Sequence, residues 1–260
     1  MISTASLINK ELELVNSWLN ANKICVNGDK TKYILFSYKK TTQLPQIKIG
    51  LNCIQETKST KFLGVIFDKH LTFEDHITLI SSKMAKSIGI IYKLNRFLPQ
   101  NVLKRLLLSL IQPYYTYGIE AWYGTSKNLT DKIFILQKKS IRAVNCLPYN
   151  AHTNDYFKSM QILKLEDQFK LQTAQYIFKT LYLKNDEELN ENLYKHSDIH
   201  NYNTRNASGF SIPRYNKTKS QYKIDFSGVK IWNSLPSSIK NSRNISDFSR
   251  KLKKNILNSY

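Results

Sequence analysis

The chain has 260 residues, enough to bury a substantial hydrophobic core in one large domain or two small ones. Hydrophobic residues make up 42% of it, and glycine and proline number only 8 and 6, which excludes a disordered or fibrous protein. Its 39 Lys and Arg residues outnumber 19 Asp and Glu residues, for a formal net charge of +20. This imbalance predicts a polyanionic partner and argues against a typical small-molecule metabolic enzyme.

Part of the lysine content has a compositional explanation. The chain holds 32 Lys but 7 Arg, beside 24 Asn and 16 Tyr, and Lys, Asn and Tyr are encoded by A/T-rich codons. The positive charge is nevertheless concentrated in two segments. Residues 81–150 carry 11 basic and 2 acidic side chains, and residues 196–260 carry 12 and 3. Codon bias alone does not arrange charge in blocks, so a nucleic-acid partner is favoured.

Other broad classes are not indicated. No apolar run reaches the ~20 residues that span a membrane, and residues 1–20 lack the basic-then-apolar pattern of a signal peptide. Cys25, Cys53 and Cys146 show no disulfide or zinc-ligand spacing, as is typical of a reducing compartment. The sequence therefore predicts an intracellular protein of the nucleus or cytoplasm, without a membrane partner. It indicates no oligomeric state.

Residues 1–73 predict a leading helix followed by a small sheet. Ile8, Leu12, Val15 and Leu19 share one helical face, which Trp18 extends. Segments 32–37, 47–50 and 61–67 are rich in β-branched and aromatic residues and are separated by turn residues, which favours strands, most simply antiparallel ones.

Residues 74–185 predict a mainly helical bundle. Apolar residues at helical spacing begin after Glu74 and Asp75: Ile77, Ile80, Met84, Ile88 and Ile91. Further helices are expected over 102–111, 129–146 and 165–183. The two acids at the start of the first helix are interpreted as favourable charges at a helix N-terminus rather than as metal ligands.

Residues 186–260 predict a loop-rich, basic C-terminal module. The segment 186–225 is polar and weakly periodic, and a basic helix is expected over 245–257. The predicted fold class is therefore α+β, with a leading helix, a small antiparallel sheet, a helical bundle and this module.

Side chains for self-contained catalysis are missing. There is no Asp-Asp pair for two-metal nucleotidyl transfer, no Walker loop and no His-Glu-x-x-His pattern. The five His residues make no metal-ligand spacing. No metal site and no cofactor are predicted in this chain.

Six short patterns occur in a defined order: WLNANK at 18–23, NGDKTKYILF at 27–36, KFLGVIFD at 61–68, IQPYYTYG at 111–118, LQKKSIR at 136–142 and IWNSLP at 231–236. Together they resemble the part of jockey-like non-LTR retrotransposon reverse transcriptases that follows the catalytic strand. The resemblance implies the end of the palm, the primer grip, a thumb and a tail.

The resemblance also implies roles for particular residues. Lys30 would be the lysine that offsets charge on the departing pyrophosphate; the alternative is a solvated lysine on a turn, which is the effective interpretation without the family's carboxylates. Phe62, Leu63 and Gly64 would form the primer grip. Gly64 would allow close backbone approach to a ligand, whereas an ordinary buried strand is the alternative for this segment. The catalytic Tyr-x-Asp-Asp carboxylates of the family are expected before Met1, and Mg²⁺ is expected only with them, so this chain alone is not expected to polymerise.

The basic thumb segment is expected to contact the phosphates of an RNA or DNA template–primer duplex. The candidate residues are Lys83, Lys86, Lys93, Lys138, Lys139 and Arg142. A solvated helix face explains any one of them equally well, so the prediction depends on the basic segment as a whole. The leading hypothesis is a truncated remnant of an RNA-directed DNA polymerase. A non-enzymatic RNA- or DNA-binding module retained by the host is the alternative. A structural helical protein remains a third hypothesis if the two basic segments form no continuous surface.

Overall fold

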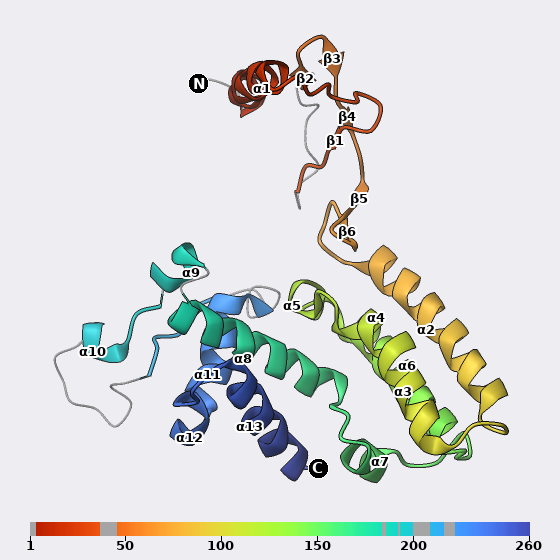
Figure 1. Ribbon diagram of the computed structural model, residues 1–260. Coiled ribbons are helices and arrows are strands. Elements are labelled where there is room, and N and C mark those ends of the chain that lie inside the picture. The colour runs from red at the N-terminus through yellow and green to blue at the C-terminus, as the bar shows by residue number, and fades with distance from the viewer. Residues whose placement is uncertain (1–3, 37–45, 184–185, 192, 200–208, 216–221) are drawn as a thin grey trace. The chain divides into compact units, whose positions relative to one another are not determined.

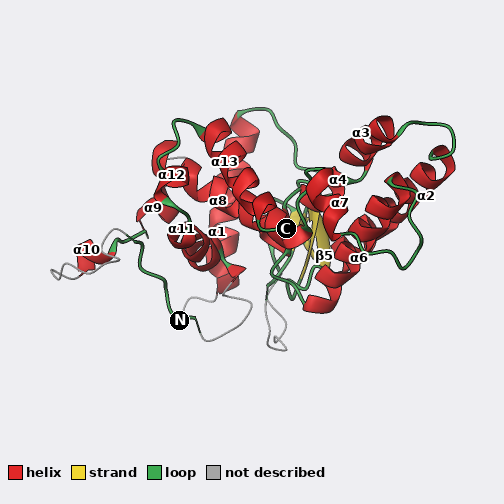
Figure 2. Cartoon of the chain, turned by 90° about the horizontal axis from the view of Figure 1, so that it is seen from below, coloured by secondary structure: helices red, strands yellow, loops and turns green. Residues whose placement is uncertain are grey.

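The computed structural model describes residues 4–36, 46–183, 186–191, 193–199, 209–215 and 222–260. The chain divides into two compact units, Met1–His76 and Ile77–Tyr260, here called the N-terminal unit and the helical unit. Helices dominate the described residues, and strands occur only in the N-terminal unit (Figures 1 and 2). The predicted order of leading helix, small β elements and helical bundle is confirmed.

The N-terminal unit contains one long helix, α1 (Thr4–Ala21), and six short strands. These are β1 (Lys32–Tyr33), β2 (Lys48–Ile49), β3 (Asn52–Cys53), β4 (Gln55–Glu56), β5 (Ser59–Phe62) and β6 (Val65–Asp68). They form three two-stranded pairs, β1–β4, β2–β3 and β5–β6, rather than one continuous sheet. The expected antiparallel pairing is wrong for β1–β4, which is parallel. A parallel pair needs a long crossover connection, and 21 residues separate Tyr33 at the end of β1 from Gln55 at the start of β4.

A small core holds α1 on these strands. Ile47, Ile49 and Ile54 are buried, and half-buried residues of α1, Ile8, Leu12 and Leu19, pack against them. Asn9 fixes the helix to β2 with both ends of its amide: Nδ2 donates to the Gln46 carbonyl, and Oδ1 accepts from the Lys48 N–H, each at 3.0 Å.

Val15 is 45% exposed and does not belong to this buried face, and neither does Trp18, contrary to prediction. The Trp18 side chain is 61% exposed, and Leu7 and Leu14 are also exposed. The spacing of these three residues places them along one side of α1, because positions i, i+7 and i+11 recur on one helical face. The helix therefore has a buried apolar face and a second, uncovered one.

The helical unit follows, and its first helix begins in the last residues of the N-terminal unit. Its elements are α2 (Glu74–Leu94), α3 (Gln100–Leu110), α4 (Gln112–Thr116), α5 (Ile119–Trp122), α6 (Lys127–Val144), α7 (Asn154–Ser159), α8 (Leu165–Leu183), α9 (Glu187–Glu191), α10 (His196–Ile199), the π-helical turn η2 (Ile224–Gly228), α11 (Val229–Ser234), α12 (Ser237–Lys240) and α13 (Ile245–Asn258). The four helices predicted between residues 74 and 185 are confirmed as α2, α3, α6 and α8.

In helix α2 the apolar residues at helical spacing form the buried face. All five members of the predicted stripe are buried: Ile77, Ile80, Met84, Ile88 and Ile91. Glu74 and Asp75 lie in the first turn and Lys93 in the last, which complements the helix dipole. The interpretation of the two acids as helix-terminal charges agrees with this position.

A second core joins α8 to the C-terminal helices. The ring of Phe178 on α8 lies 4.6 Å from that of Phe248 on α13, and Trp232 on α11 lies 5.9 Å from Phe248, measured between centroids. Tyr260 adds a polar link, because its hydroxyl donates to Asp167 (2.7 Å) and accepts from the Lys164 N–H (2.8 Å).

The residues from 224 onward are more helical than the predicted loop-rich module. Helices α11 and α12 have six and four residues, and helices this short carry too few apolar positions to show a period of 3.6. The closing helix predicted over 245–257 is confirmed as α13. The predicted three-part division of the chain at residues 73 and 185 stays a prediction.

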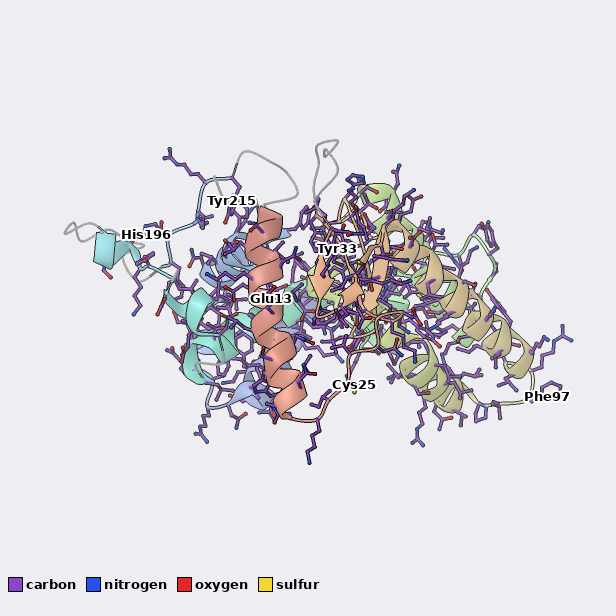
Figure 3. The ribbon with its side chains drawn as sticks, turned by 90° about the horizontal axis from the view of Figure 1, so that it is seen from above. Glu13, Cys25, Tyr33, Phe97, His196 and Tyr215 are labelled. Atoms are coloured by element: carbon purple, nitrogen blue, oxygen red, sulfur yellow. The ribbon has the colours of Figure 1, made fainter. Side chains whose placement is uncertain are left out.

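None of the helices described is both long and apolar enough to cross a bilayer. Cys25, Cys53 and Cys146 are exposed free thiols, and Figure 3 labels Cys25 in the segment that follows α1.

Candidate nucleic-acid interface

The segment 61–67, predicted as one strand, is a hairpin. Strands β5 and β6 pair antiparallel with Phe62 opposite Val65, so only Leu63 and Gly64 form the loop. Both have positive φ, 44° and 90°, as the tightest hairpin turns require. The sequence missed this turn because leucine is unfavourable at positive φ and gives no turn signal.

The three predicted primer-grip residues are brought together at the tip of this hairpin. Leu63 is 74% exposed and Phe62 is 62% exposed, and Gly64 is exposed as well. This excludes the alternative of an ordinary buried strand. The Phe62 ring lies 6.4 Å from that of Phe67, which lies 5.5 Å from buried Phe73, so a row of aromatic rings connects the tip to the base of the hairpin.

Asp68 organises the loop between β6 and α2. Its carboxylate accepts hydrogen bonds from the backbone N–H groups of His70 (3.0 Å), Thr72 (3.0 Å) and Phe73 (2.6 Å), and from the Thr72 hydroxyl (3.1 Å). Leu71 and Phe73 adopt positive φ in this loop, a conformation that must be held by its surroundings. The aspartate of the Leu-Gly-x-x-x-Asp pattern therefore has a structural role.

The same contacts set the charge state of Asp68. Partial burial alone would raise the pKa of its carboxyl, but the hydrogen bonds from Thr72, Phe73 and His70 outweigh burial and lower the pKa below its ordinary value. The folded form thus favours the ionised carboxylate.

Asp68→Asn is expected to weaken the β5–β6 hairpin by about 1–2 kcal/mol at pH 7, because an amide nitrogen cannot accept hydrogen bonds. The folded pKa is depressed, so this contribution is fully present above the unfolded value of about 3.9 and is lost as the pH falls through the folded pKa. Hydrogen exchange of the β5 and β6 amides at several pH values measures it. The difference in hairpin stability between wild type and variant should shrink at acid pH. Asp29→Asn, on an exposed turn, is the control and should have little effect on the hairpin. A difference that does not depend on pH, or an equal effect of the control, would contradict the role of Asp68.

Lys30 lies on a separate turn of the N-terminal unit. Asn27 closes this turn: its Oδ1 accepts from the Lys30 N–H at 3.1 Å, and its carbonyl accepts from the Thr31 hydroxyl at 2.8 Å. The Lys30 side chain is exposed. The geometry leaves its ammonium accessible to an anion, and none of the residues that the structure describes forms an ion pair with it.

The three candidate lysines of α2 are exposed. Lys86 and Lys93 are seven residues apart, on the side of α2 opposite its buried stripe. The Lys83 Nζ lies 5.7 Å from the centroid of the Tyr114 ring, a cation–π geometry. None of the three forms an ion pair with a residue that the structure describes. The turn after α2 continues this surface with Phe97, which is 80% exposed and labelled in Figure 3.

The candidate residues of α6 divide into two kinds. Lys138 and Lys139 are half-buried, and their Nζ atoms lie 4.8 Å and 5.8 Å from the ring centroids of Phe134 and Tyr149. Arg142 instead points to its own chain, because its Nε donates to the Ala151 carbonyl at 2.9 Å. Arg142 thus holds the connection between α6 and α7, and its remaining donors are those available to a partner.

The same pattern at 136–142 contains a residue that sequence reasoning missed. Gln137 is fully buried. Its Nε2 donates to the Leu163 carbonyl at 2.9 Å, and its Oε1 accepts from the Leu165 N–H, at the start of α8, at 3.0 Å. The signal was its position four residues from both Ile133 and Ile141, on the apolar face of the helix.

One lysine of each basic segment interacts electrostatically with the other in the helical unit. Burial lowers the pKa of Lys253 on α13, and the charge of Lys104 on α3 lowers it further. Two like charges from distant parts of the chain therefore lie near each other. An anion between them would relieve this repulsion.

The described residues contain no cluster of side chains that suits a metal ion. Within the described ranges, no three His, Cys, Asp or Glu side chains gather closely enough to hold a metal. The candidate interface consists instead of exposed lysine side chains and the apolar tip of the β5–β6 hairpin.

Comparison with known proteins gives a distant relationship. The chain is 25% identical over 174 residues to the RNA-directed DNA polymerase from mobile element jockey of Drosophila melanogaster, and 22% identical over 174 residues to that of Drosophila funebris. It is also 22% identical over 173 residues to the "Probable RNA-directed DNA polymerase from transposon BS" of Drosophila melanogaster.

Each of these alignments covers 65% of this chain but 19% of the relative, so the chain spans a minor part of the curated relatives it matches. No protein-family model matches, and no solved structure matches. The alignments establish distant, partial homology to jockey-like retrotransposon RNA-directed DNA polymerases.

Proposed function

We propose that this chain is the template–primer-binding part of a non-LTR retrotransposon reverse transcriptase, without the Tyr-x-Asp-Asp carboxylates that polymerisation needs. The distant homology supports the enzyme class. The observation that carries the proposal is the β5–β6 hairpin, because its exposed tip coincides with the residues that resemble a primer grip. Detectable primer extension by this chain alone would contradict the absence of catalysis.

The hairpin suits contact with the end of a primer strand. Phe62 and Leu63 present apolar surface to sugar and base, and Gly64 adds no side chain that would hold the backbone away. The anchoring of Phe62 through Phe67 to Phe73 limits the freedom that the tip would lose on binding.

The basic side chains would contribute in two different ways. Lys83, Lys86, Lys93, Lys138 and Lys139 would contact phosphates of the duplex without reading its sequence. Lys30 would act on a departing pyrophosphate only where the family's carboxylates and Mg²⁺ are present. The described side chains do not fit a metal site, so no metal-dependent step is assigned to this chain.

Affinity for a strand end tests the proposal. The probes are a blunt-ended RNA–DNA duplex and the same duplex closed at each end by a linker without nucleotides, measured by fluorescence anisotropy. We expect tighter binding to the blunt duplex, because only it presents a 3′ end. The double variant Phe62→Ser, Leu63→Ser is expected to remove most of this preference, about tenfold, and to leave the affinity for the closed duplex unchanged.

Leu51→Ser is the matched control, because Leu51 is a fully exposed leucine in the turn between β2 and β3. It should keep the preference for the blunt duplex. Equal affinity of the wild-type chain for both probes, or an unchanged preference in the double variant, would contradict the role of the hairpin. It would favour the alternative, a non-enzymatic RNA- or DNA-binding module.

A further inference from the structure

The helical unit contains a cavity of about 810 Å³ that the proposed function does not use. Four parts of the chain line it: the segment from α5 into α6, the first turns of α8, residues 222–236, and α13. Its volume falls within the range of small-ligand pockets, about 300–1,000 Å³.

One wall of the cavity is aromatic. The rings of Tyr123 and Phe169 are stacked, with centroids 4.4 Å apart and an interplanar angle of 18°. Tyr222 meets Tyr123 edge-on at 6.1 Å. Gly124 makes this possible, because a Cβ at that position would lie 2.5 Å from the Cβ of Tyr222. A flat, partly exposed aromatic surface such as this suits a second flat ring.

The lysines that line the cavity differ in whether an acidic side chain pairs with them. Lys127 and Lys230 line the cavity, are exposed, and make no ion pair with any described residue. Lys170 is neutralised by Glu166, with 2.8 Å between Nζ and Oε1. Asp131 also lines the cavity, and its carboxylate repels phosphate but accepts hydrogen bonds from amino groups. Lys127 and Lys230 are therefore the cations available to an anionic ligand.

We propose that this cavity binds an unpaired nucleotide of single-stranded RNA or DNA. The base would lie against Tyr222 and Tyr123, and its phosphates would pair with Lys127 and Lys230. Stacking on aromatic side chains beside basic groups is how single strands are bound without reading sequence. The inference rests on the proposed function in one respect, that the chain binds nucleic acid, and adds a separate site for the unpaired strand.

The test compares a blunt RNA–DNA duplex with the same duplex carrying a single-stranded extension of about ten nucleotides, within the range that one stacking platform covers. Anisotropy titrations should show about tenfold tighter binding to the extended duplex. Tyr222→Ala is expected to remove most of that gain and to leave the affinity for the blunt duplex unchanged. Tyr194→Ala, at an exposed tyrosine outside the cavity lining, is the matched control and should keep the gain.

Two further variants test the site without removing an aromatic side chain, and the second of them separates the site from an effect on folding. Gly124→Ala removes no lining side chain but displaces Tyr222, so it should also reduce the gain. Lys127→Ser with Lys230→Ser changes only exposed side chains and should reduce it while the thermal unfolding curve is unchanged.

The outcomes distinguish this inference from the proposed function. Equal affinity of the wild-type chain for both duplexes, or an undiminished gain in Tyr222→Ala, would overturn the single-strand site. Absence of binding to either duplex at low salt would instead contradict the proposed function, and this inference with it.

Discussion

Gln137→Leu is expected to lower the free energy of unfolding of the helical unit by about 2–4 kcal/mol. The leucine keeps the apolar volume but removes both hydrogen-bonding ends of the amide. The carbonyl of Leu163 and the N–H of Leu165 would then be buried without partners, and each unsatisfied buried group costs about 1–3 kcal/mol. The N–H of Leu165 is also one of the first N–H groups of α8, which have no acceptor within their own helix, so Gln137 on α6 caps α8.

Urea unfolding followed by circular dichroism measures this loss. Gln100→Leu is the matched control, because Gln100 is exposed and its side chain bonds, among the described residues, only the side chain of Asn145. The control should change the free energy of unfolding by no more than about 0.5 kcal/mol. Equal losses in the two variants would show that Gln137 does not hold α8 in the way the hydrogen bonds indicate.

The helices were predictable because their signal is spread over many residues. In α2 a stripe of five apolar side chains repeats the helical period, and every one of them is buried. A helix predicted from many residues is still recognisable when one of them is unusual. The β5–β6 hairpin depends on two residues alone, and the conformation of Leu63 opposes the preference of its residue type. Local chemistry could therefore not show the turn.

The two tryptophans in the family-like patterns show a second limit. Trp18 and Trp232 stand in similar apolar surroundings in the sequence, yet Trp18 is 61% exposed and Trp232 is 6% exposed. The difference lies in partners far along the chain, because Trp232 stacks on Phe248. The burial of a single side chain is decided by tertiary packing, which a pattern within one helix does not contain.

The family-like patterns mostly encode the fold rather than the interface. Gly118 has φ of 60° at the start of α5, a conformation that favours glycine. The Asn233 amide donates to and accepts from the backbone of Phe210, at 2.8 and 3.0 Å. The side chains of Asp68 and Gln137 likewise form hydrogen bonds to the backbone of loops. Most of the exposed bases lie outside such patterns, so the predicted nucleic-acid partner and the predicted phosphate contacts depend on charge more than on these patterns, and both stay predictions.

Replacing Lys83, Lys86 and Lys93 by serine is expected to weaken duplex binding about tenfold to hundredfold near 0.1 M salt. Each phosphate that a lysine neutralises contributes about 0.9 to the slope of log affinity against log salt concentration, so the magnitude of the slope should fall by about 2–3 in this variant. Anisotropy titrations of a closed duplex at several salt concentrations measure both quantities. The duplex sequence should not matter, because phosphate contacts carry no sequence information.

The control must remove equal charge elsewhere, because lowering the net charge of +20 weakens long-range attraction by itself. Serine at Lys10, Lys48 and Lys58, exposed lysines of the N-terminal unit, makes the same change in net charge. Long-range attraction is screened beyond about 10 Å at this ionic strength, whereas a phosphate contact releases counterions and alters the slope. A control slope equal to that of the wild-type chain, beside a reduced slope for the α2 variant, would place the duplex on α2. Equal reductions in both variants would mean that the bases act through total charge alone.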